Sequence, residues 1–360
     1  MSESAKKTSV AVLFGGQSSE HEVSRMSATS IVENLSPEKY EVHMVGITKD
    51  GRWLLYTGPV GSLVSGGWEQ GPVCPAFLSP DPSVHGLVVM GDAPRTIHID
   101  CVFPALHGKN GEDGTLQGLL ALSGIPYVGC NTASSAICMD KAVTHSLLSA
   151  ANIEQAHYLW FYADRFDAAP DTIKNKICAR FDFPVFVKPA NAGSSVGVSR
   201  VDGPEGLDGA IRKAAHEDTK IIVEEGIVGQ EVECAVLGNR QGAEASIVGE
   251  IGASAEFYDY DDKYINGTSQ LYIPARIEEE ASSRIRETAV RAFRLLGCSG
   301  LARVDFFVTE KEHKVVLNEL NTLPGFTSIS MYPKLWMAMG LSYGELLDKL
   351  ISLAFQQAGC

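Results

Sequence analysis

The chain has 360 residues, of which 45% are hydrophobic and 21% are charged. This length suffices for two or three domains with their own cores, and the composition is that of an ordinary soluble globular protein. The formal net charge of −14 and the lack of any basic run argue against a nucleic-acid-binding surface, because phosphate affinity comes from clustered Lys and Arg. An anionic ligand would therefore need local positive charges.

Eight cysteines show no CxxC spacing and mostly lie within apolar runs. This pattern favours reduced, buried thiols over disulfides or a zinc site. The first residues contain only a short apolar run, too brief for a signal peptide or a membrane span. We therefore expect a cytoplasmic protein that does not bind a membrane.

Alternating strands and helices up to residue 130 indicate a parallel α/β domain. Its expected strands lie at residues 10–14, 40–48, 52–56 and 96–103. Asp50-Gly51 between the second and third strands is typical of a hairpin turn. Residues 57–95 are rich in Gly, Pro and Ser and lack strong periodicity, so we expect a loop-dominated insertion there.

Two further units of strands and helices follow. In the second unit, strands are expected at residues 157–162, 183–188, 198–201 and 220–225, and helices at 141–151, 172–179 and 207–216. In the third, strands are expected at residues 231–238, 245–252, 301–308 and 314–320, and helices at 278–296 and 343–357. Two successive sheets with flanking helices predict two lobes and a cleft between them, which is a favoured ligand site.

Hard oxygen ligands lie on the last two expected strands. Asp305 belongs to the apolar strand LARVDFFV, and the strand KVVLNEL delivers Glu319 and then Asn321. Two carboxylates and an amide on adjacent strands suit magnesium held with nucleotide phosphates. For these three residues alone, a satisfied polar cluster is the simpler interpretation. The turn TLPGFTSIS that follows offers N–H groups and hydroxyls to an anionic group.

The glycine turn NAGSSVG at residues 191–197 follows Lys188 and lies between two expected strands. Its small residues allow the backbone to approach a polyphosphate, and Lys188 and Lys141 could add point charges. It is not a Walker P-loop, because GxxxxGK[ST] is absent. Alone it fits a structural hairpin. Together with the strand-end carboxylates, it favours a nucleotide–magnesium site.

Other segments carry candidate site residues, some of which also have a purely structural explanation. Glu20 in GGQSSE could bind a ligand or simply suit the helix dipole. His107 in ALHGKNGEDGTLQG lies in a glycine-rich strand-to-helix loop, where packing is an unconvincing reason for a histidine. The strand end at 221–231 could present groups to adenine and ribose, or be a solvated acidic end. The segment FYDYDDKY at 257–264, with three tyrosines, fits a lid or substrate loop.

Seven ordered motifs, which leave mainly residues 57–95 uncovered, resemble those of D-alanine–D-alanine ligases of the ATP-grasp superfamily. They are SSEHEVS, LHGKNGEDGTLQG, MDKAVTH, FVKPANAGSSVGVS, FYDYDDKY, GLARVDFF and NELNTLPGFTSIS. The resemblance implies a mixed α/β, three-domain ATP-grasp fold that holds ATP between its central and C-terminal lobes. The implied domains are a Rossmann-like N-terminal domain (1–130), a central lobe (131–226) and a C-terminal lobe (227–360).

The resemblance also implies ATP as a substrate, with two Mg²⁺ or Mn²⁺ ions. The implied ATP-binding residues are Lys141 and Lys188 at the phosphates, Ser194 and Ser195 in the closing loop, Glu224 and Ile227 at adenine, and Glu231 at ribose. The implied metal ligands are Asp305, Glu319 and Asn321. The ions would offset the repulsion between a carboxylate and the triphosphate.

The implied reaction joins two D-alanines through an acyl phosphate, in peptidoglycan precursor synthesis. Glu20, linked to Ser194 and Tyr264, would receive the first ammonium group, and His107 would lie by the first carboxylate. The implied oxyanion stabilisers are Arg303 and the backbone of Gly325. The implied ligands of the second carboxylate are Lys263, Ser330 and the N–H of Met331. No clear base for the second ammonium is evident.

D-alanine is the expected second substrate. Lactate-forming relatives replace the pair Lys263-Tyr264, which is intact, and resistance ligases commonly carry Arg where this chain has Met331. An apolar side chain leaves room for a methyl group but discriminates weakly against a hydroxyl, so a D-alanine–D-serine ligase is an alternative. Two further alternatives are another ATP-grasp amino-acid ligase and a non-catalytic nucleotide-binding protein. The non-catalytic protein would be expected to lose Arg303 or a metal ligand. The family resemblance suggests a homodimer.

Overall fold

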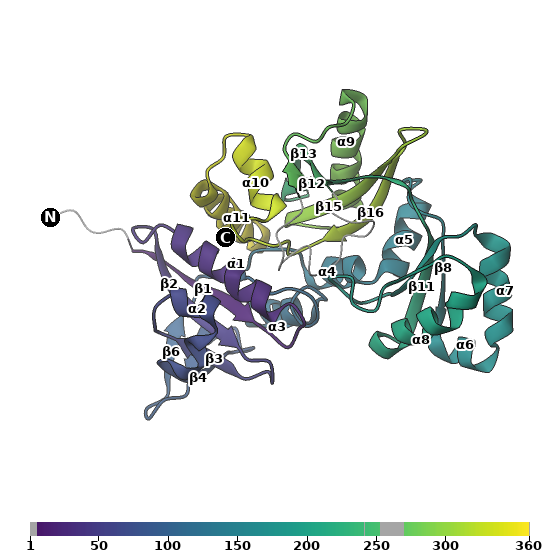
Figure 1. Cartoon of the computed structure of the whole chain (residues 1–360). Helices are drawn as coiled ribbons and strands as arrows, with labels where there is room; N and C mark the ends of the chain where they lie inside the picture. The colour runs from purple at the N-terminus through teal and green to yellow at the C-terminus, as the bar shows by residue number, and fades with distance from the viewer. Residues whose placement is uncertain (1–5, 241, 253–269, 360) are drawn as a thin grey trace.

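The computed structural model of the protein describes residues 6–240, 242–252 and 270–359, which form three β-sheets with flanking helices (Figure 1). In the view of Figure 1 the N-terminal sheet and the four-stranded middle sheet lie at opposite ends, with the five-stranded C-terminal sheet between them. The expected mixed α/β fold is confirmed. Within these ranges, no helix combines the length and the hydropathy needed to span a bilayer.

The N-terminal sheet has the order β6-β5-β4-β3-β2-β1-β7. Its strands are β1 (Thr8–Gly15), β2 (Tyr40–Ile47), β3 (Trp53–Tyr56), β4 (Val73–Leu78), β5 (Gly86–Val89), β6 (Arg95–His98) and β7 (Cys101–Pro104). Only the pairs of β1 with β2 and β7 are parallel, and the others are antiparallel. The expectation of a parallel sheet therefore holds only for β2, β1 and β7 at one side of the sheet, while the predicted β2–β3 hairpin is confirmed.

The expectation of a loop-dominated insertion at residues 57–95 is wrong. Besides β4 and β5, this segment contains α2 (Gly61–Ser65) and the short 3₁₀ helix η1 (Gly67–Gln70). It also contributes to the core, because Trp68 is fully buried and meets the edge of Phe14 with ring centroids 4.8 Å apart. The elements are four to six residues long and separated by Gly and Pro, so they are too short to show a period.

The middle part contains an antiparallel sheet of order β10-β9-β11-β8. Its elements are β8 (Tyr158–Tyr162), α6 (Ala163–Ala168), α7 (Pro170–Arg180), β9 (Val185–Pro189), β10 (Ser199–Val201), α8 (Leu207–Glu217) and β11 (Lys220–Glu225). One face of α8 carries buried residues at helical spacing, Leu207, Ala210, Ile211 and Ala214, which pack on this sheet. The predicted glycine turn connects β9 to β10.

Two helices lead into this part, α4 (Thr132–Met139) and α5 (Lys141–Ala150). Asp140 is the N-cap of α5, and its carboxylate accepts a hydrogen bond from the N–H of Val143 at 3.1 Å. This cap fixes the first turn of α5. Because Lys141 and His145 are four residues apart on α5, they share one face of the helix.

The C-terminal part contains an antiparallel sheet of order β14-β13-β12-β15-β16. Its elements are β12 (Gly229–Gly238), β13 (Glu244–Gly252), β14 (Gln270–Tyr272), α9 (Glu279–Leu295), β15 (Gly300–Thr309), β16 (Val315–Asn321), α10 (Met331–Ala338) and α11 (Tyr343–Ala358). Helix α11 packs back onto α1 (His21–Asn34) and β7, so one core joins the two ends of the chain (Figure 1). Helices α3 (Thr115–Ser123) and α1 flank the N-terminal sheet.

Candidate active site

A cavity of about 880 Å³ lies between the four-stranded and the five-stranded sheets. Half of the sequence-predicted site residues line it, namely Lys141, Lys188, Ser194, Ser195, Glu224, Ile227, Glu231, Glu319 and Asn321. The predicted cleft between two lobes is therefore confirmed. Lys263 and Tyr264 lie outside the described residues.

Register brings the metal candidates together. Asp305 on β15 pairs directly with Glu319 on β16, and Arg303 pairs with Asn321. Directly paired residues of an antiparallel sheet share a face. Asn321 Nδ2 donates to Asp305 Oδ2 at 2.9 Å. Two carboxylates and an amide supply the hard oxygen donors that Mg²⁺ prefers, although within the described ranges no group of three or more His, Cys, Asp or Glu side chains is placed to hold one metal ion.

Arg303 is held between two acidic side chains. Its Nε and Nη2 donate to Asp305 Oδ1 and Oδ2 at 2.8 and 2.7 Å. Its Nε also lies 3.1 Å from Glu233 Oε2. Since Glu233 pairs with Asp305 across β12 and β15, the guanidinium lies on the same face as a row of carboxylates. Arg303 is thereby a fixed cation beside the metal candidates.

Glu20 meets the glycine turn. Ser194 Oγ donates to Glu20 Oε1 at 2.5 Å, and the Glu20 side chain makes no cap hydrogen bond to α1. A Cβ built at Gly193 or Gly108 would lie 2.9 or 2.7 Å from Glu20 Oε2. A side chain at either position would push the carboxylate aside. The contact joins the N-terminal part to the loop over the cavity, while the role of Glu20 stays a prediction.

His107 is buried and uses both ring nitrogens within the protein. Its Nδ1 donates to the carbonyl of Leu323 at 2.9 Å, and its Nε2 lies 3.0 Å from Ser27 Oγ. Burial lowers the pKa of His107, with the charge of Glu20 opposing it in part. The neutral ring connects α1 to the loop before α10. His107 therefore has a packing role, which we did not expect from the sequence, and its contact with substrate stays a prediction.

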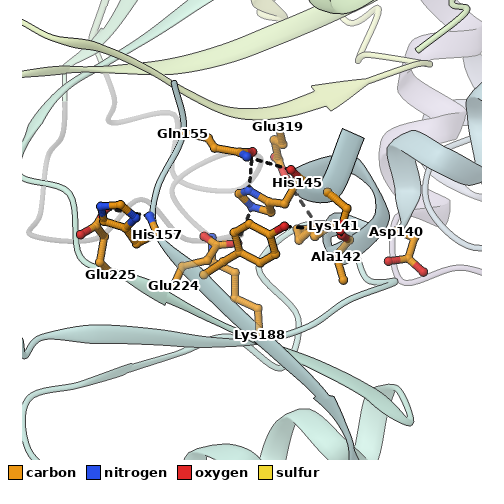
Figure 2. A network of polar contacts seen from close by, with 12 residues as sticks. Asp140, Lys141, Ala142, His145, Gln155, His157, Lys188, Glu224, Glu225 and Glu319 are labelled. Atoms are coloured by element: carbon orange, nitrogen blue, oxygen red, sulfur yellow. Dashed lines mark hydrogen bonds and ion pairs between the residues drawn. The ribbon is translucent and has the colours of Figure 1, made fainter. Parts of the chain in front are cut away.

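Lys188 and Glu224 face each other in the cavity (Figure 2). Lys188 Nζ donates to Glu224 Oε2 at 2.7 Å, and His145 Nε2 lies 3.1 Å from Glu224 Oε1. Burial alone would raise the pKa of Glu224, but the charge of Lys188 and the His145 hydrogen bond outweigh it, so the pKa is lowered. Lys141 Nζ donates to the carbonyl of Ala192 at 2.8 Å and lies 3.6 Å from Glu319 Oε2.

The loop before α10 holds the remaining candidates. Ser330 Oγ accepts from the N–H of Thr327 at 3.0 Å, and a Cβ at Gly325 would lie 2.8 Å from that Oγ. Met331 is 5% exposed and belongs to the core, where a Cβ at Gly249 would approach its Sδ to 2.6 Å. The Met331 side chain therefore packs on β13, and its place beside the second substrate stays a prediction. Its N–H lies in the first turn of α10.

Sequence reasoning missed three polar residues. Glu112 lines the cavity, and burial, followed by the negative charges of Glu20 and Glu319, raises its pKa well above the ordinary value. Glu233 and His145 were the other two. The alternation Glu231-Val-Glu233 on an apolar strand signals one acidic strand face, and His145 is one turn beyond Lys141 in MDKAVTH.

Family profiles described as D-ala D-ala ligase N-terminus and C-terminus match residues 9–130 and 147–352. A D-alanine–D-alanine ligase of Caldicellulosiruptor bescii is 53% identical over 352 residues, which cover 98% of this chain and 96% of the relative.

Two solved structures are similar over almost the whole chain. The VanG D-Ala:D-Ser ligase of Enterococcus faecalis is 45% identical, with a TM-score of 0.88 and coverage of 97% of this chain and 100% of that one. The D-alanine–D-alanine ligase of Coxiella burnetii is 37% identical, with a TM-score of 0.86 and coverage of 99% and 96%.

Proposed function

The chain belongs to the D-alanine–D-alanine ligase family, and on that basis we propose that it joins two D-alanines to D-alanyl-D-alanine while ATP becomes ADP and phosphate. The product is a building block of peptidoglycan. The observation that carries this function is the bond from Ser194, which lines the cavity, to Glu20 of the N-terminal part. A nucleotide site and an amine-binding carboxylate thereby meet at one loop.

In the first step, the carboxylate of one D-alanine attacks the γ-phosphate and ADP leaves, which gives a D-alanyl phosphate. We assign Glu20 to the ammonium group of this D-alanine, because a carboxylate held by Ser194 and flanked by two glycines is open to a small cation. Lys141 and Lys188 are assigned to the phosphates as point charges.

Metal ions belong to the same step in this proposal. Asp305, Glu319 and Asn321 would hold Mg²⁺ or Mn²⁺, and two such ions would offset the repulsion between the attacking carboxylate and the triphosphate. The support is the oxygen donor set on paired strands.

In the second step, the amine of another D-alanine attacks the acyl carbon, and phosphate leaves. Arg303 is assigned to the oxyanion, because its contacts with Asp305 and Glu233 fix the cation before charge develops. The N–H of Gly325 is assigned to the same oxygen. Ser330 and the N–H of Met331 are assigned to the second carboxylate, since α10 begins there and a helix N-terminus favours an anion. Lys263 and Tyr264 complete the proposed site.

D-serine is the second candidate for the accepting amino acid, because the similar solved structure from Enterococcus faecalis is a D-Ala:D-Ser ligase. We propose that D-alanine is preferred. The Met331 side chain is packed against β13 and offers no hydrogen bond to a serine hydroxyl. Discrimination by apolar surroundings is weak, on the order of 10–200-fold.

The test is phosphate release from Mg·ATP on addition of D-alanine, with L-alanine as control and the dipeptides identified by mass spectrometry. We expect release with D-alanine only, and D-alanyl-D-alanine as the main product from equal D-alanine and D-serine. No D-alanine-dependent release from folded protein would refute the ligase function. An equal or greater kcat/KM for D-serine would refute the preference alone.

We further propose that the enzyme is a cytoplasmic homodimer with domains at residues 1–130, 131–226 and 227–360. The domain division is supported by the distribution of the three sheets and by the profile that ends at residue 130. The dimer rests on the family resemblance, and sedimentation equilibrium tests it. The use of ATP and the exposed free thiol of Cys178 fit the cytoplasm.

A further inference from the structure

His145 is buried at the adenine end of the cavity and has no role in the reaction described above. It is 2% exposed, and its ring stacks on Tyr158 with centroids 4.7 Å apart and planes at 25°. Figure 2 shows the ring between the side chains of Gln155 and Glu224. We infer that His145 is a positioning residue that orients the Glu224 carboxylate for the 6-amino group of adenine, and so sets the preference for ATP over GTP. The inference rests on the proposed function.

Each nitrogen of the His145 ring faces an oxygen atom of another side chain. Gln155 Nε2 donates to the carbonyl of His145 at 2.8 Å and to Ser149 Oγ at 2.6 Å. This leaves Gln155 Oε1 facing His145 Nδ1 at 2.7 Å. A carbonyl oxygen only accepts, so Nδ1 carries a proton. Nε2 lies 3.1 Å from Glu224 Oε1, at hydrogen-bonding distance of the carboxylate. Both ring nitrogens therefore meet acceptor oxygens.

Gln155 is itself anchored to the C-terminal sheet. It forms a parallel bridge with Leu317 of β16, and the N–H of Leu317 donates to the carbonyl of Glu154 at 2.9 Å. The line Leu317–Gln155–His145–Glu224 therefore runs from β16 through α5 to β11. It fixes the carboxylate relative to both walls of the cavity.

Two donors hold Glu224, one on each oxygen. His145 binds Oε1 and Lys188 binds Oε2. Each carboxylate oxygen has a second lone pair, so the group can still accept from a ligand. At position 6, adenine presents an amino donor and guanine a carbonyl acceptor. A carboxylate fixed in place accepts a hydrogen bond from the amino group of adenine and repels the carbonyl oxygen of guanine. Without His145, Glu224 is free to turn toward Lys188, and this selection weakens.

The experiment compares three variants of the full-length enzyme with ATP and with GTP. His145→Phe keeps the ring over Tyr158 and removes both ring nitrogens. His145→Gln restores an N–H at the position of Nε2. His157→Phe is the matched control, because His157 lies near the same segment but is exposed and outside the cavity lining. Steady-state kcat and KM are measured for both nucleotides and for D-alanine.

We expect H145F to raise the KM for ATP about tenfold and to lower the ATP-to-GTP ratio of kcat/KM by a similar factor, as for loss of one charged hydrogen bond. The kcat and the KM for D-alanine should stay within about twofold, and H145Q should recover most of the ATP affinity. H157F should behave as wild type. A general loss of structure would not produce this split between nucleotides.

An active H145F enzyme with wild-type KM for ATP and unchanged nucleotide preference would overturn the inference and leave the ligase function intact. If H145F does not fold, the variant Gln155→Met tests the inference instead, because it removes the acceptor for His145 Nδ1 and leaves the imidazole ring in place. It should shift the ATP-to-GTP ratio in the same direction, and an unchanged ratio would overturn the inference. Absence of D-alanine-dependent phosphate release in the wild type would instead refute the proposed function.

Discussion

Glu112 and Glu224 are carboxylates that line the same cavity and respond to it in opposite ways. Burial disfavours the ionised form of both. Lys188 reverses this effect at Glu224, whose pKa is lowered. Glu112 instead faces the negative charges of Glu20 and Glu319, which add to burial and raise its pKa. The charge of the neighbours therefore decides which carboxyl group is ionised.

Replacement of Glu112 by Gln should stabilise the ligand-free protein at high pH. The unfolded carboxyl titrates near 4.5 and the folded one at higher pH. Between these values only the folded state keeps the proton, so wild-type stability falls as pH rises through this window. The Tm of E112Q should match that of wild type at pH 4.5 and exceed it by about 2 °C or more at pH 8. Scanning fluorimetry measures this, and a difference that does not widen with pH contradicts it.

At the scale of elements, long segments were predictable and short ones were not. Strands β12, β15 and β16 and helices α8, α9 and α11 carry enough period for their residues to be found within a few positions. The helices α4 and α6, and the elements of residues 57–95, escaped because they are only four to eight residues long.

The candidate site divides in the same way. The neighbouring positions of Asp305, Glu319 and Asn321 could be predicted because the two strands that carry them follow from local pattern, while their role as metal ligands stays a prediction. The burial of His107 and Met331, and the pairing of Arg303 with Glu233, depend on contacts between distant segments. A single sequence, considered without an alignment of its relatives, contains no record of such contacts.

The glycine turn between β9 and β10 provides a prediction at this scale. Gly193→Ala places a Cβ 2.9 Å from Glu20 Oε2, so the carboxylate must move and the Ser194 bond weakens. We expect kcat/KM for D-alanine to fall about 10- to 100-fold, because a displacement of about 1 Å costs this much in a reactive geometry. The KM for ATP should change less.

Gly118→Ala is the control for this substitution. Gly118 lies within α3 and a Cβ there meets nothing within 4 Å, so activity should be unchanged and the helix stabilised by roughly 0.5–1 kcal/mol. Equal activity of G193A and G118A would contradict the role of the close approach.

At the scale of the molecule, the last helix ties the two ends of the chain together. Leu346, Leu347 and Leu350 on α11 are fully buried in the core that also contains residues of β1, β7 and α1. Tyr40 Oη also donates to Asp348 Oδ1 at 2.7 Å. The N-terminal part, which carries Glu20, is thereby held against the C-terminal part, which carries Arg303.

Leu350→Ala should loosen this connection. We expect a loss of about 2–5 kcal/mol in the free energy of unfolding, because a buried Leu is replaced and a cavity is left. Ser352→Ala on the exposed side of the same helix should change it by no more than about 0.5 kcal/mol. Urea denaturation measures both, and a similar small effect of the two changes would contradict the role of α11.

The transfer of a carboxylate oxygen to phosphate tests the central claim most directly. The enzyme is given Mg·ATP and D-alanine labelled with ¹⁸O in its carboxylate, and the released phosphate is analysed by mass spectrometry. If D-alanine attacks the γ-phosphate and the second amine then displaces phosphate from the acyl carbon, each phosphate formed with dipeptide carries one ¹⁸O from the labelled carboxylate. Unlabelled phosphate formed together with D-alanyl-D-alanine would contradict the acyl phosphate route.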